Sequence, residues 1–439
     1  MRRPRVGITV CIVAVSAACG RSSDPAHVSS SAASPPAAQG PTIIKVAYWG
    51  GPEEIAIIQG VITRWQAQHP SVQVRLEHTP FSVYVSRLLT RMAGDVAPDI
   101  IATEANLFVN FWAKGALLPL DSFIAQDPTF HLNEFFPEVR NRFTVNGQLY
   151  AMPRDTAPFA CIYYNKRLFD HARLPCPTDE WTTDDLLRLA RQLTAREGDR
   201  VTHYGFYGWA WQNFVYAFGG QLVDDVSHPT RCVLDSPQAV AGLQFYADLM
   251  NKEGVAPTPV ALGNLAMGAQ QLFISQRAAM FSSGIWETPI LRQIRDFDWD
   301  VVMFPKGPSG LRAFGTGGTG YCILKSSRHP AVAWEVLKAL AGEEGQTQLA
   351  EQGLVQPANK RIAEGPRWAG NALPPPHKGM LNDAVRFTVY DPFIPEWREI
   401  VELYIIPELD LVFNGHQTAA QAVATFVPHV NNLLAHLSK

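Results

Sequence analysis

The chain has 439 residues, of which 47% are apolar and 18% charged, and its 37 basic and 40 acidic side chains leave a formal net charge of −3. This length is about twice that of a typical domain and favours two lobes, and the composition is that of a packed globular chain rather than a disordered one. The sequence has no dense basic block, so nothing in the charge pattern indicates a nucleic-acid partner.

The N-terminus has the pattern of an export signal. A basic start precedes an apolar run at residues 7–18 that is too short to span a bilayer comfortably. Small residues then lead to Cys19, so residues 1–19 resemble a bacterial lipoprotein signal in which Cys19 is lipidated, although Ser16 stands where such signals usually carry an aliphatic residue. An ordinary secretory signal is the alternative. Residues 20–41 are rich in Ser, Ala and Pro and are expected to form a flexible tether.

Cysteine usage leaves the disulfide pattern open. The cysteines that follow the signal are Cys161, Cys176, Cys232 and Cys322. An oxidising compartment permits disulfides, four cysteines allow three pairings, and the spacing does not choose among them. No pair has the spacing of metal ligands, and we expect no metal. We also expect no cofactor.

The first part of the mature chain predicts an α/β sheet. Strand patterns near residues 42–49, 72–76 and 98–101 alternate with helical patterns at residues 53–68 and 81–94. This alternation is typical of βαβ units on a mainly parallel sheet, and such sheets bind ligands at the carboxyl ends of their strands. The side chains at those ends, which we expect near a ligand, are Trp49, Thr79, Glu104 and Asn106.

Residues 148–169 are interpreted as a passage between two lobes. Apolar residues lie on both sides of a polar, proline-containing centre at 153–158, and residues 159–165 have the composition of a buried strand. This interpretation would place Asp155 in a cleft beside a ligand. The alternative is that Asp155 pairs with Arg154 and only braces the passage.

The second half is more helical and contains a glycine cluster. Residues 315–320 satisfy the pattern G-x-G-x-x-G, but a dinucleotide-binding fingerprint must open a helix, whereas residues 321–324 have the pattern of a strand. We therefore interpret the cluster as a loop near a second crossover, where Gly317 and Gly318 let backbone N–H groups approach a ligand oxygen.

The order of motifs resembles the extracellular solute-binding proteins of ABC importers, specifically their carbohydrate-binding group, over nearly the whole mature chain. No single motif is specific, and the resemblance rests on an ordered series that comprises Trp49 and residues 97–100, 115–120, 146–153, 163–169, 219–220, 278–280, 284–286 and 330–340.

The resemblance implies a type II periplasmic-binding-protein fold, in which two α/β lobes with mainly parallel sheets are joined by crossover hinge strands. We expect an N-terminal lobe from residues 42–155 plus about 285–320, and a C-terminal lobe from residues 156–284 plus about 321–439. It also implies binding without chemistry, so the chain is expected not to be an enzyme. The expected partners are a sugar, the transmembrane subunits of an ABC permease and, through the lipid on Cys19, the membrane. We expect a monomer held on the extracytoplasmic face, in the periplasmic space.

Sugar binding requires aromatic rings that stack on C–H faces and planar polar groups that satisfy hydroxyls. Trp286 matches the family's stacking tryptophan and Trp397 resembles a second, each weighed against a role in core packing. Of Trp209 and Trp211, one is expected to face the cleft and the other the core. The predicted ligand-binding residues are Trp49, Thr79, Glu104, Asn106, Asp155, Trp209, Trp211, Gln212, Trp286, Glu287, Gly317, Gly318, Arg386 and Trp397.

The sequence leaves the ligand class open. Family members that bind glycerophosphodiesters carry an arginine at a position similar to Arg386, and an arginine suits a phosphate as well as sugar hydroxyls. The predicted acidic residues Glu104, Asp155 and Glu287 would repel a phosphate, so we favour an oligosaccharide or amino sugar. An exported glycosidase is a further alternative, which would need two carboxylates about 5 to 10 Å apart across the cleft.

Overall fold

The computed structural model describes residues 40–265 and 267–437. The predicted lipoprotein signal, with Cys19, and nearly all of the predicted tether lie outside the described residues. Within the described ranges no helix combines the length and the apolar character needed to cross a membrane.

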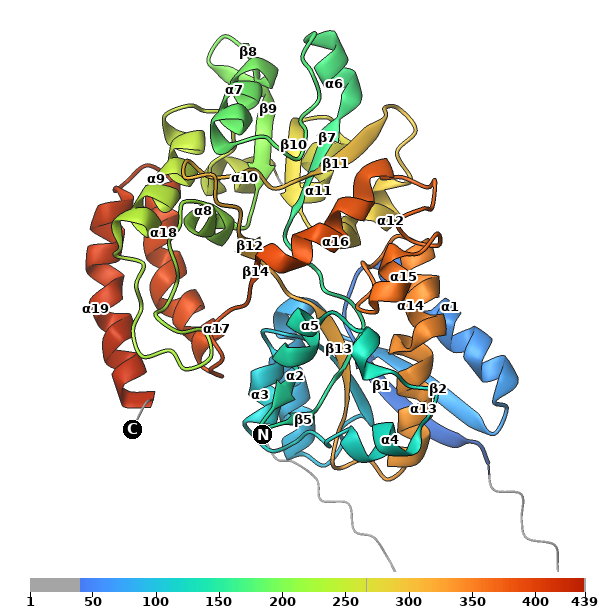
Figure 1. The fold of residues 1–439 in the computed structure, drawn as a ribbon. Helices are drawn as coiled ribbons and strands as arrows, with labels where there is room; N and C mark the ends of the chain where they lie inside the picture. Colours follow the sequence, from blue (N-terminus) through green and yellow to red (C-terminus); the bar gives the residue numbers. More distant parts are fainter. Residues whose placement is uncertain (1–39, 266, 438–439) are drawn as a thin grey trace, which may run out of the picture. The chain divides into compact units, whose positions relative to one another are not determined.

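A five-stranded sheet forms the centre of the first lobe, with the strand order β2-β1-β3-β13-β6 (Figure 1). The strands β1 and β2 are parallel, as are β1 and β3, whereas β13 runs antiparallel to both β3 and β6. The strand bounds are β1 (Thr42–Tyr48), β2 (Val72–His78), β3 (Ile100–Glu104), β6 (Met152–Pro153) and β13 (Thr319–Ile323). The helices of this lobe include α1 (Pro52–Gln68), α2 (Phe81–Ala93), α3 (Phe108–Trp112), α4 (Asp121–Gln126), α5 (Pro137–Arg142), α13 (Pro330–Ala341) and α14 (Glu343–Glu351).

A second five-stranded sheet forms the centre of the other lobe, with the order β11-β7-β10-β9-β8. Only β9 and β10 pair in parallel, and the other neighbours are antiparallel. The strand bounds are β7 (Cys161–Asn165), β8 (Ala195–Glu197), β9 (Arg200–Gly208), β10 (Ala278–Ser283) and β11 (Trp299–Met303). The helices between and after these strands are α6 (Lys166–His171), α7 (Thr183–Leu193), α8 (Trp211–Ala217), α9 (Pro237–Asn251), α10 (Pro259–Leu265), α11 (Ala269–Ile274), α12 (Thr288–Leu291), α17 (Trp397–Ile400), α18 (Ile406–Phe413) and α19 (Ala419–Leu437).

Both sheets are therefore mixed rather than mainly parallel. Two of the strands that break the parallel pattern carry the chain between the lobes: β13 follows the passage back into the first sheet, and β7 follows the passage out of it. The third, β8, pairs antiparallel with the next strand along the chain, β9. A strand that enters a sheet from the neighbouring lobe starts at the carboxyl ends of the strands that are followed by helices. It therefore runs antiparallel to those strands.

Strand pairing corrects part of the expected lobe division. The expectation placed residues 285–320 in the first lobe and residues 321–439 in the second. Instead, β11 pairs with β7 in the second sheet, and β13 pairs with β3 in the first. Helix α13 then packs on β13 and α1. The order of motifs along the chain cannot reveal which sheet a strand joins, because hydrogen bonds to distant strands decide it.

Residues 148–169 do carry the chain from one sheet to the other, since β6 belongs to the first sheet and β7 to the second. A second passage contains β12 (Phe314–Gly315), which pairs in parallel with β14 (Thr388–Val389). The two passages are joined by hydrogen bonds from the Thr316 hydroxyl to the Thr156 carbonyl, at 2.6 Å, and from the Phe159 N–H to the Gly315 carbonyl, at 2.9 Å.

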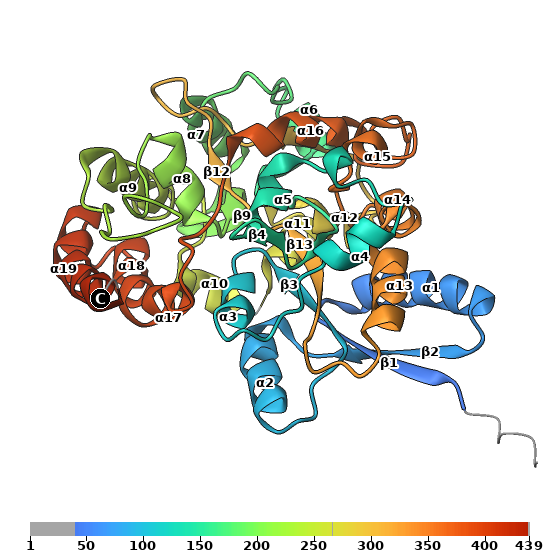
Figure 2. The ribbon, with the colours of Figure 1, turned by 60° about the horizontal axis from the view of Figure 1, so that its bottom comes forward.

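Helices from the C-terminal part cover the second lobe. Helices α9, α18 and α19 pack against one another and lie side by side in both ribbon views (Figure 2). Further short elements of the described chain are β4 (Thr144–Val145), β5 (Gln148–Leu149), η1 (Leu132–Glu134), η2 (Ile285–Glu287), α15 (Lys360–Glu364), η3 (Pro376–Met380), α16 (Leu381–Ala384), η4 (Val385–Phe387) and η5 (Val401–Ile405).

The cysteines that follow the signal are free thiols in the described chain. Cys161, Cys232 and Cys322 are buried and Cys176 is partly buried. None of the three disulfide pairings that the sequence left open is formed among them. Burial raises the pKa of the Cys232 thiol to about 11, so this thiol is not an activated nucleophile.

Tyr84 ties the central strands of the first sheet to helix α2. Its side chain is fully buried, and its hydroxyl lies 3.0 Å from the carbonyl oxygen of Ala47 on β1 and 2.7 Å from that of Ala102 on β3. Replacing the hydroxyl with hydrogen leaves the ring in place. It removes the one donor that the Tyr84 side chain offers to these two carbonyls.

We predict that Tyr84→Phe lowers the free energy of unfolding by about 1–3 kcal/mol, the usual cost of an unsatisfied buried hydrogen-bonding group. The matched control is Tyr150→Phe, whose hydroxyl donates to Gln148 at an exposed position and should change stability by less than about 0.5 kcal/mol. Urea unfolding of both variants checks this, and equal midpoints would contradict the assigned role of Tyr84.

Candidate ligand-binding site

A cavity of about 420 Å³ is lined by residues of both lobes. Its lining residues are Trp49, Glu54, Phe81, Glu104, Asn106, Arg154, Asp155, Ala157, Phe159, Trp209, Gln212, Ile285, Trp286, Gly317, Gly318, Thr319, Leu354, Val355 and Asp391. A smaller cavity of about 180 Å³ shares Phe81, Glu104, Asn106, Gln212 and Asp391 with it. The two cavities therefore adjoin, and nine of the fourteen predicted ligand-binding residues line the larger one.

Three aromatic rings form the wall that the second lobe contributes. The ring of Phe159 lies edge-on to Trp209, with centroids 5.0 Å apart, and edge-on to Trp286, with centroids 5.8 Å apart. Trp286 follows β10 in the short helix η2 (Ile285–Glu287) and is only partly buried. Such rings offer flat apolar faces toward the cavity.

Gly284 and Glu287 fix the orientation of Trp286. A Cβ atom at Gly284 would lie 1.9 Å from Cζ3 of the indole, so only glycine lets the ring lie against the backbone there. The indole Nε1–H donates to Oε1 of Glu287 at 3.1 Å, and the Ser283 hydroxyl donates to the same oxygen at 2.8 Å. Glu287 is buried, which raises its pKa, and it does not line either cavity. We predicted Glu287 as a ligand contact, whereas the structure places it behind Trp286 as a support.

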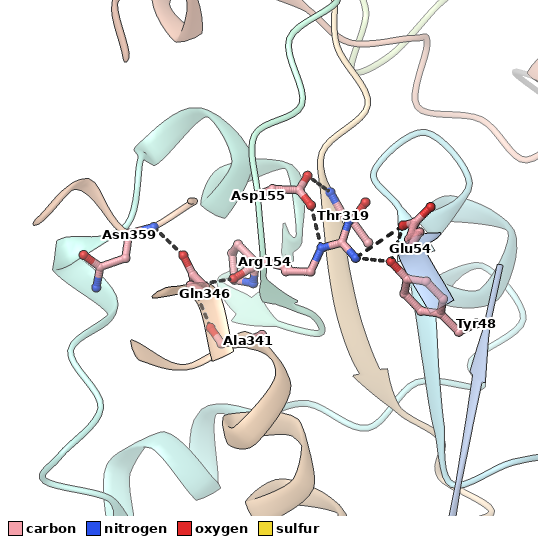
Figure 3. A network of polar contacts seen from close by, with 9 residues as sticks. Tyr48, Glu54, Arg154, Asp155, Thr319, Ala341, Gln346 and Asn359 are labelled. Atoms are coloured by element: carbon pink, nitrogen blue, oxygen red, sulfur yellow. Dashed lines mark hydrogen bonds and ion pairs between the residues drawn. The ribbon is translucent and has the colours of Figure 1, made fainter. Parts of the chain in front are cut away.

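A buried polar network lies where the chain leaves the first sheet (Figure 3). Nε of Arg154 donates to Oδ2 of Asp155 at 2.6 Å, and Nη1 donates to the Tyr48 hydroxyl. The Tyr48 hydroxyl donates to Oε1 of Glu54 at 2.6 Å, and the Thr319 N–H donates to Oδ1 of Asp155 at 2.8 Å. Burial raises the pKa of both carboxyl groups, and the adjacent guanidinium opposes that shift. Asp155 thus pairs with Arg154 and also lines the cavity.

The polar junction, which we define as Glu104, Asn106, Gln212 and Asp391, lines both cavities. Asn106 holds it together: its Nδ2 donates to the Thr316 carbonyl at 2.9 Å, and its Oδ1 accepts the Asp391 N–H at 3.1 Å. Burial, together with the nearby charge of Asp391, raises the pKa of Glu104 to about 8. Burial also raises the pKa of Asp391 to about 6.

The glycine cluster makes room for the polar junction. A Cβ atom at Gly317 would lie 2.6 Å from Oε1 of Glu104, so the missing side chain leaves space for that carboxyl group. Gly318 has a φ of 68°, a conformation that favours glycine, and its carbonyl accepts the Ala105 N–H at 2.8 Å. As predicted, the residues after the cluster form a strand, β13, and not a helix.

The remaining predicted residues fall into two groups. Trp211 and Trp397 are buried and line the smaller cavity. Thr79 and Arg386 are absent from the described lining of both cavities. The Thr79 N–H donates to the Tyr48 carbonyl at 3.0 Å, and the exposed Arg386 pairs with Asp383 and lies over Phe387. The structure therefore does not bring Arg386 to the site.

Sequence reasoning missed several lining residues. Glu54 lies in the first turn of helix α1, which follows β1, so the rule that ligands lie at strand ends could have found it. Phe159 lies in the recognised passage. Asp391 follows β14, and no local pattern marks it, because only packing brings this segment to the cavity.

The described residues offer no evident metal site. Within residues 40–265 and 267–437, no group of three or more His, Cys, Asp or Glu side chains is arranged to hold a metal ion. The side chains that line the two cavities supply aromatic rings, carboxyl groups and amides.

The model of the family described as bacterial extracellular solute-binding protein matches residues 50–347. This chain belongs to that family. The expected resemblance to extracellular solute-binding proteins is thereby confirmed.

Individual relatives are distant in sequence and similar in fold. The arabinooligosaccharide-binding protein of Halalkalibacterium halodurans is 24% identical over 295 residues, which are 65% of this chain and 64% of that protein. The ABC substrate-binding protein of Listeria monocytogenes in complex with cycloalternan has a TM-score of 0.81 at 23% identity, covering 90% of this chain and 99% of that one. Maltose-bound MalE3 of T. maritima has a TM-score of 0.77 at 22% identity, covering 89% and 100%. The predicted two-lobed α/β fold is confirmed.

The raised pKa of Glu104 predicts a pH dependence of stability. In the unfolded chain the Glu104 carboxyl group loses its proton near the ordinary pKa of a glutamate, whereas in the folded protein it keeps the proton up to about pH 8. The contribution of protonated Glu104 to the free energy of unfolding is therefore fully present below the ordinary pKa of a glutamate, and it is lost as the pH rises from there through about 8. We predict that Glu104→Gln gains at least about 1 kcal/mol of stability relative to the wild type between about pH 5 and pH 8.5.

The control for this experiment is Glu399→Gln, a substitution on the surface. The difference in free energy of unfolding between this variant and the wild type should stay constant across the same pH range. Urea unfolding at several pH values measures both variants. A pH-independent difference for Glu104→Gln would contradict the assigned pKa.

Proposed function

We propose that this chain is the substrate-binding lipoprotein of a bacterial ABC importer and that it captures a carbohydrate in the larger cavity. The observation that carries the proposal is the combination of aromatic rings from both lobes with carboxyl and amide groups in one cavity. Rings suit the C–H faces of a sugar, and planar polar groups suit its hydroxyls. Family membership supports a binding role.

Named relatives support a sugar as the ligand. The similar proteins described above carry names or ligands that are all saccharides: an arabinooligosaccharide, cycloalternan and maltose. By analogy, the ligand of this chain is an oligosaccharide or an amino sugar. The larger cavity and the smaller cavity that adjoins it together offer space for more than one sugar ring.

Delivery would follow from closure of the two lobes. A ligand in the cavity contacts Trp49 and Phe81 of the first lobe and Trp209 and Trp286 of the second, so it favours the conformation in which both lobes reach it. We propose that the closed, monomeric protein is received by the transmembrane permease subunits. A lipid on Cys19 would hold it at the extracytoplasmic face of the membrane.

The geometry disfavours a glycerophosphodiester. Arg386, the residue that suggested one, lies on the surface beside Asp383. Arg154 is the one guanidinium among the described residues that line the larger cavity, and it is engaged by Asp155 and Tyr48. A phosphate would instead meet the carboxyl groups of the polar junction.

We predict that sugars bind to the wild-type protein and that Trp286→Ala weakens binding by about 1–4 kcal/mol, the range expected for an aromatic anchor. Calorimetric screening of neutral sugars, amino sugars and glycerophosphodiesters measures this. The matched control is Trp65→Ala on helix α1, whose ring stacks on His69 away from both cavities and should leave the affinity unchanged. Release of reducing sugar from the oligosaccharides would instead support a glycosidase.

We also predict that saturating ligand reduces the radius of gyration measured by small-angle X-ray scattering, because only the closed form lets both lobes touch the ligand. The Trp286→Ala variant at the same ligand concentration should show a smaller reduction. Superimposable scattering curves for free and saturated wild-type protein would argue against closure as the mechanism.

A further inference from the structure

The polar junction contains acceptor groups that no protein group satisfies. In the described chain, the Asp391 carboxylate accepts no hydrogen bond, and the Oε1 atom of Gln212 is buried without a partner. Glu104 receives only one long hydrogen bond, 3.3 Å, from Nδ2 of Asn106. Buried polar groups are normally satisfied, and Gln212 lines both cavities, so its unpaired oxygen is available to a donor from outside the chain.

The nearby cations are already used elsewhere. Arg154 is held by Asp155 and Tyr48 on another side of the larger cavity. Arg398 pairs with Glu402 at 2.8 Å and lies over the Phe81 ring.

Arg142 is likewise engaged, by two backbone carbonyls and by Oδ1 of Asn106 at 3.5 Å. Its Nη2 donates to the Asp391 carbonyl at 2.8 Å and its Nε to the Ala105 carbonyl at 3.3 Å, while its guanidinium lies over the rings of Tyr390 and Phe393. The carboxyl groups of Glu104 and Asp391 thus face the cavities without a cation in direct contact.

We infer that the ligand carries a protonated amine, which binds among Glu104, Asp391 and Gln212 while its sugar ring contacts the aromatic wall. This inference rests on the proposed function and narrows its ligand class to amino sugars. A cation donates strong, charge-assisted hydrogen bonds to carboxylates. A hydroxyl or an N-acetyl group has no positive charge to offset the negative charge of the carboxylates.

Proton release accompanies such binding. Glu104 faces Asp391, Asn106, Arg142 and Arg398, and its proton is retained in the free protein because its ionised form would lie buried near Asp391. An ammonium group placed between the two carboxyl groups favours ionisation of both. Amine affinity should therefore rise with pH between about 5.5 and 7.5, as long as the amine remains protonated.

The test compares matched sugars on the full mature protein. Glucosamine, galactosamine and chitosan trisaccharide carry free amines, and each is measured by calorimetry beside its N-acetylated and its hydroxyl counterpart. We expect the amine member of a pair to bind at least about tenfold more tightly, with proton release that appears as a dependence of the heat on the ionisation enthalpy of the buffer.

Two isosteric variants test whether the preference for the amine arises at the polar junction. Glu104→Gln and Asp391→Asn should each remove most of the preference for the amine and the associated proton release. The control Asp383→Asn removes a carboxylate that pairs with Arg386 outside both cavities and should keep the preference. Thermal unfolding of each variant verifies that it is folded.

The outcomes separate this inference from the proposed function. Equal or tighter binding of the neutral sugars to the wild type overturns the amine subsite and leaves sugar binding in place. An amine preference that survives in both variants also overturns it. If no sugar of either kind binds to the wild-type protein, the proposed function fails and the inference fails with it.

Discussion

The buried pair of Arg154 and Asp155 is the interaction on which the organisation of the site depends. The guanidinium reaches the Tyr48 hydroxyl at the end of β1, and the carboxylate accepts the N–H of Thr319 at the start of β13. One ion pair thus joins the first strand, the outgoing passage and the returning strand. Removing one partner of such a buried pair typically costs about 3–5 kcal/mol, because the other charge is left without compensation. The pair therefore holds the passages in the positions from which they line the cavity.

This arrangement also sets the electrostatic character of the cavity. Because Arg154 is engaged, the acceptors of the polar junction face the cavities without this cation, while the second lobe supplies Phe159, Trp209 and Trp286 as an apolar wall. Both lobes thus contribute polar groups and aromatic rings to the cavity. A ligand that needs both kinds of contact gains its full interaction energy only when the lobes are close together, which links affinity to closure.

Several residues contribute to the site by positioning or making room for the side chains of other residues. Glu287 holds the indole of Trp286, Gly284 lets that ring lie on the backbone, and Gly317 leaves space for the Glu104 carboxyl group. Each has a sequence neighbourhood that suggests ligand binding. Their roles follow from side-chain packing between segments that are distant in the chain, which a residue pattern does not encode.

The sequence by itself determined the alternation of strands and helices in the first lobe, the passage at residues 148–169 and the family, because local hydrophobic periodicity and motif order carry that information. It also identified Trp49, Glu104 and Asn106, since strand ends converge at one edge of a sheet. The tertiary structure decided which sheet β11 and β13 join, the exclusion of Arg386 from the cavity and the inclusion of Asp391. These outcomes depend on hydrogen bonds and packing between segments far apart in the chain, so no local pattern determines them.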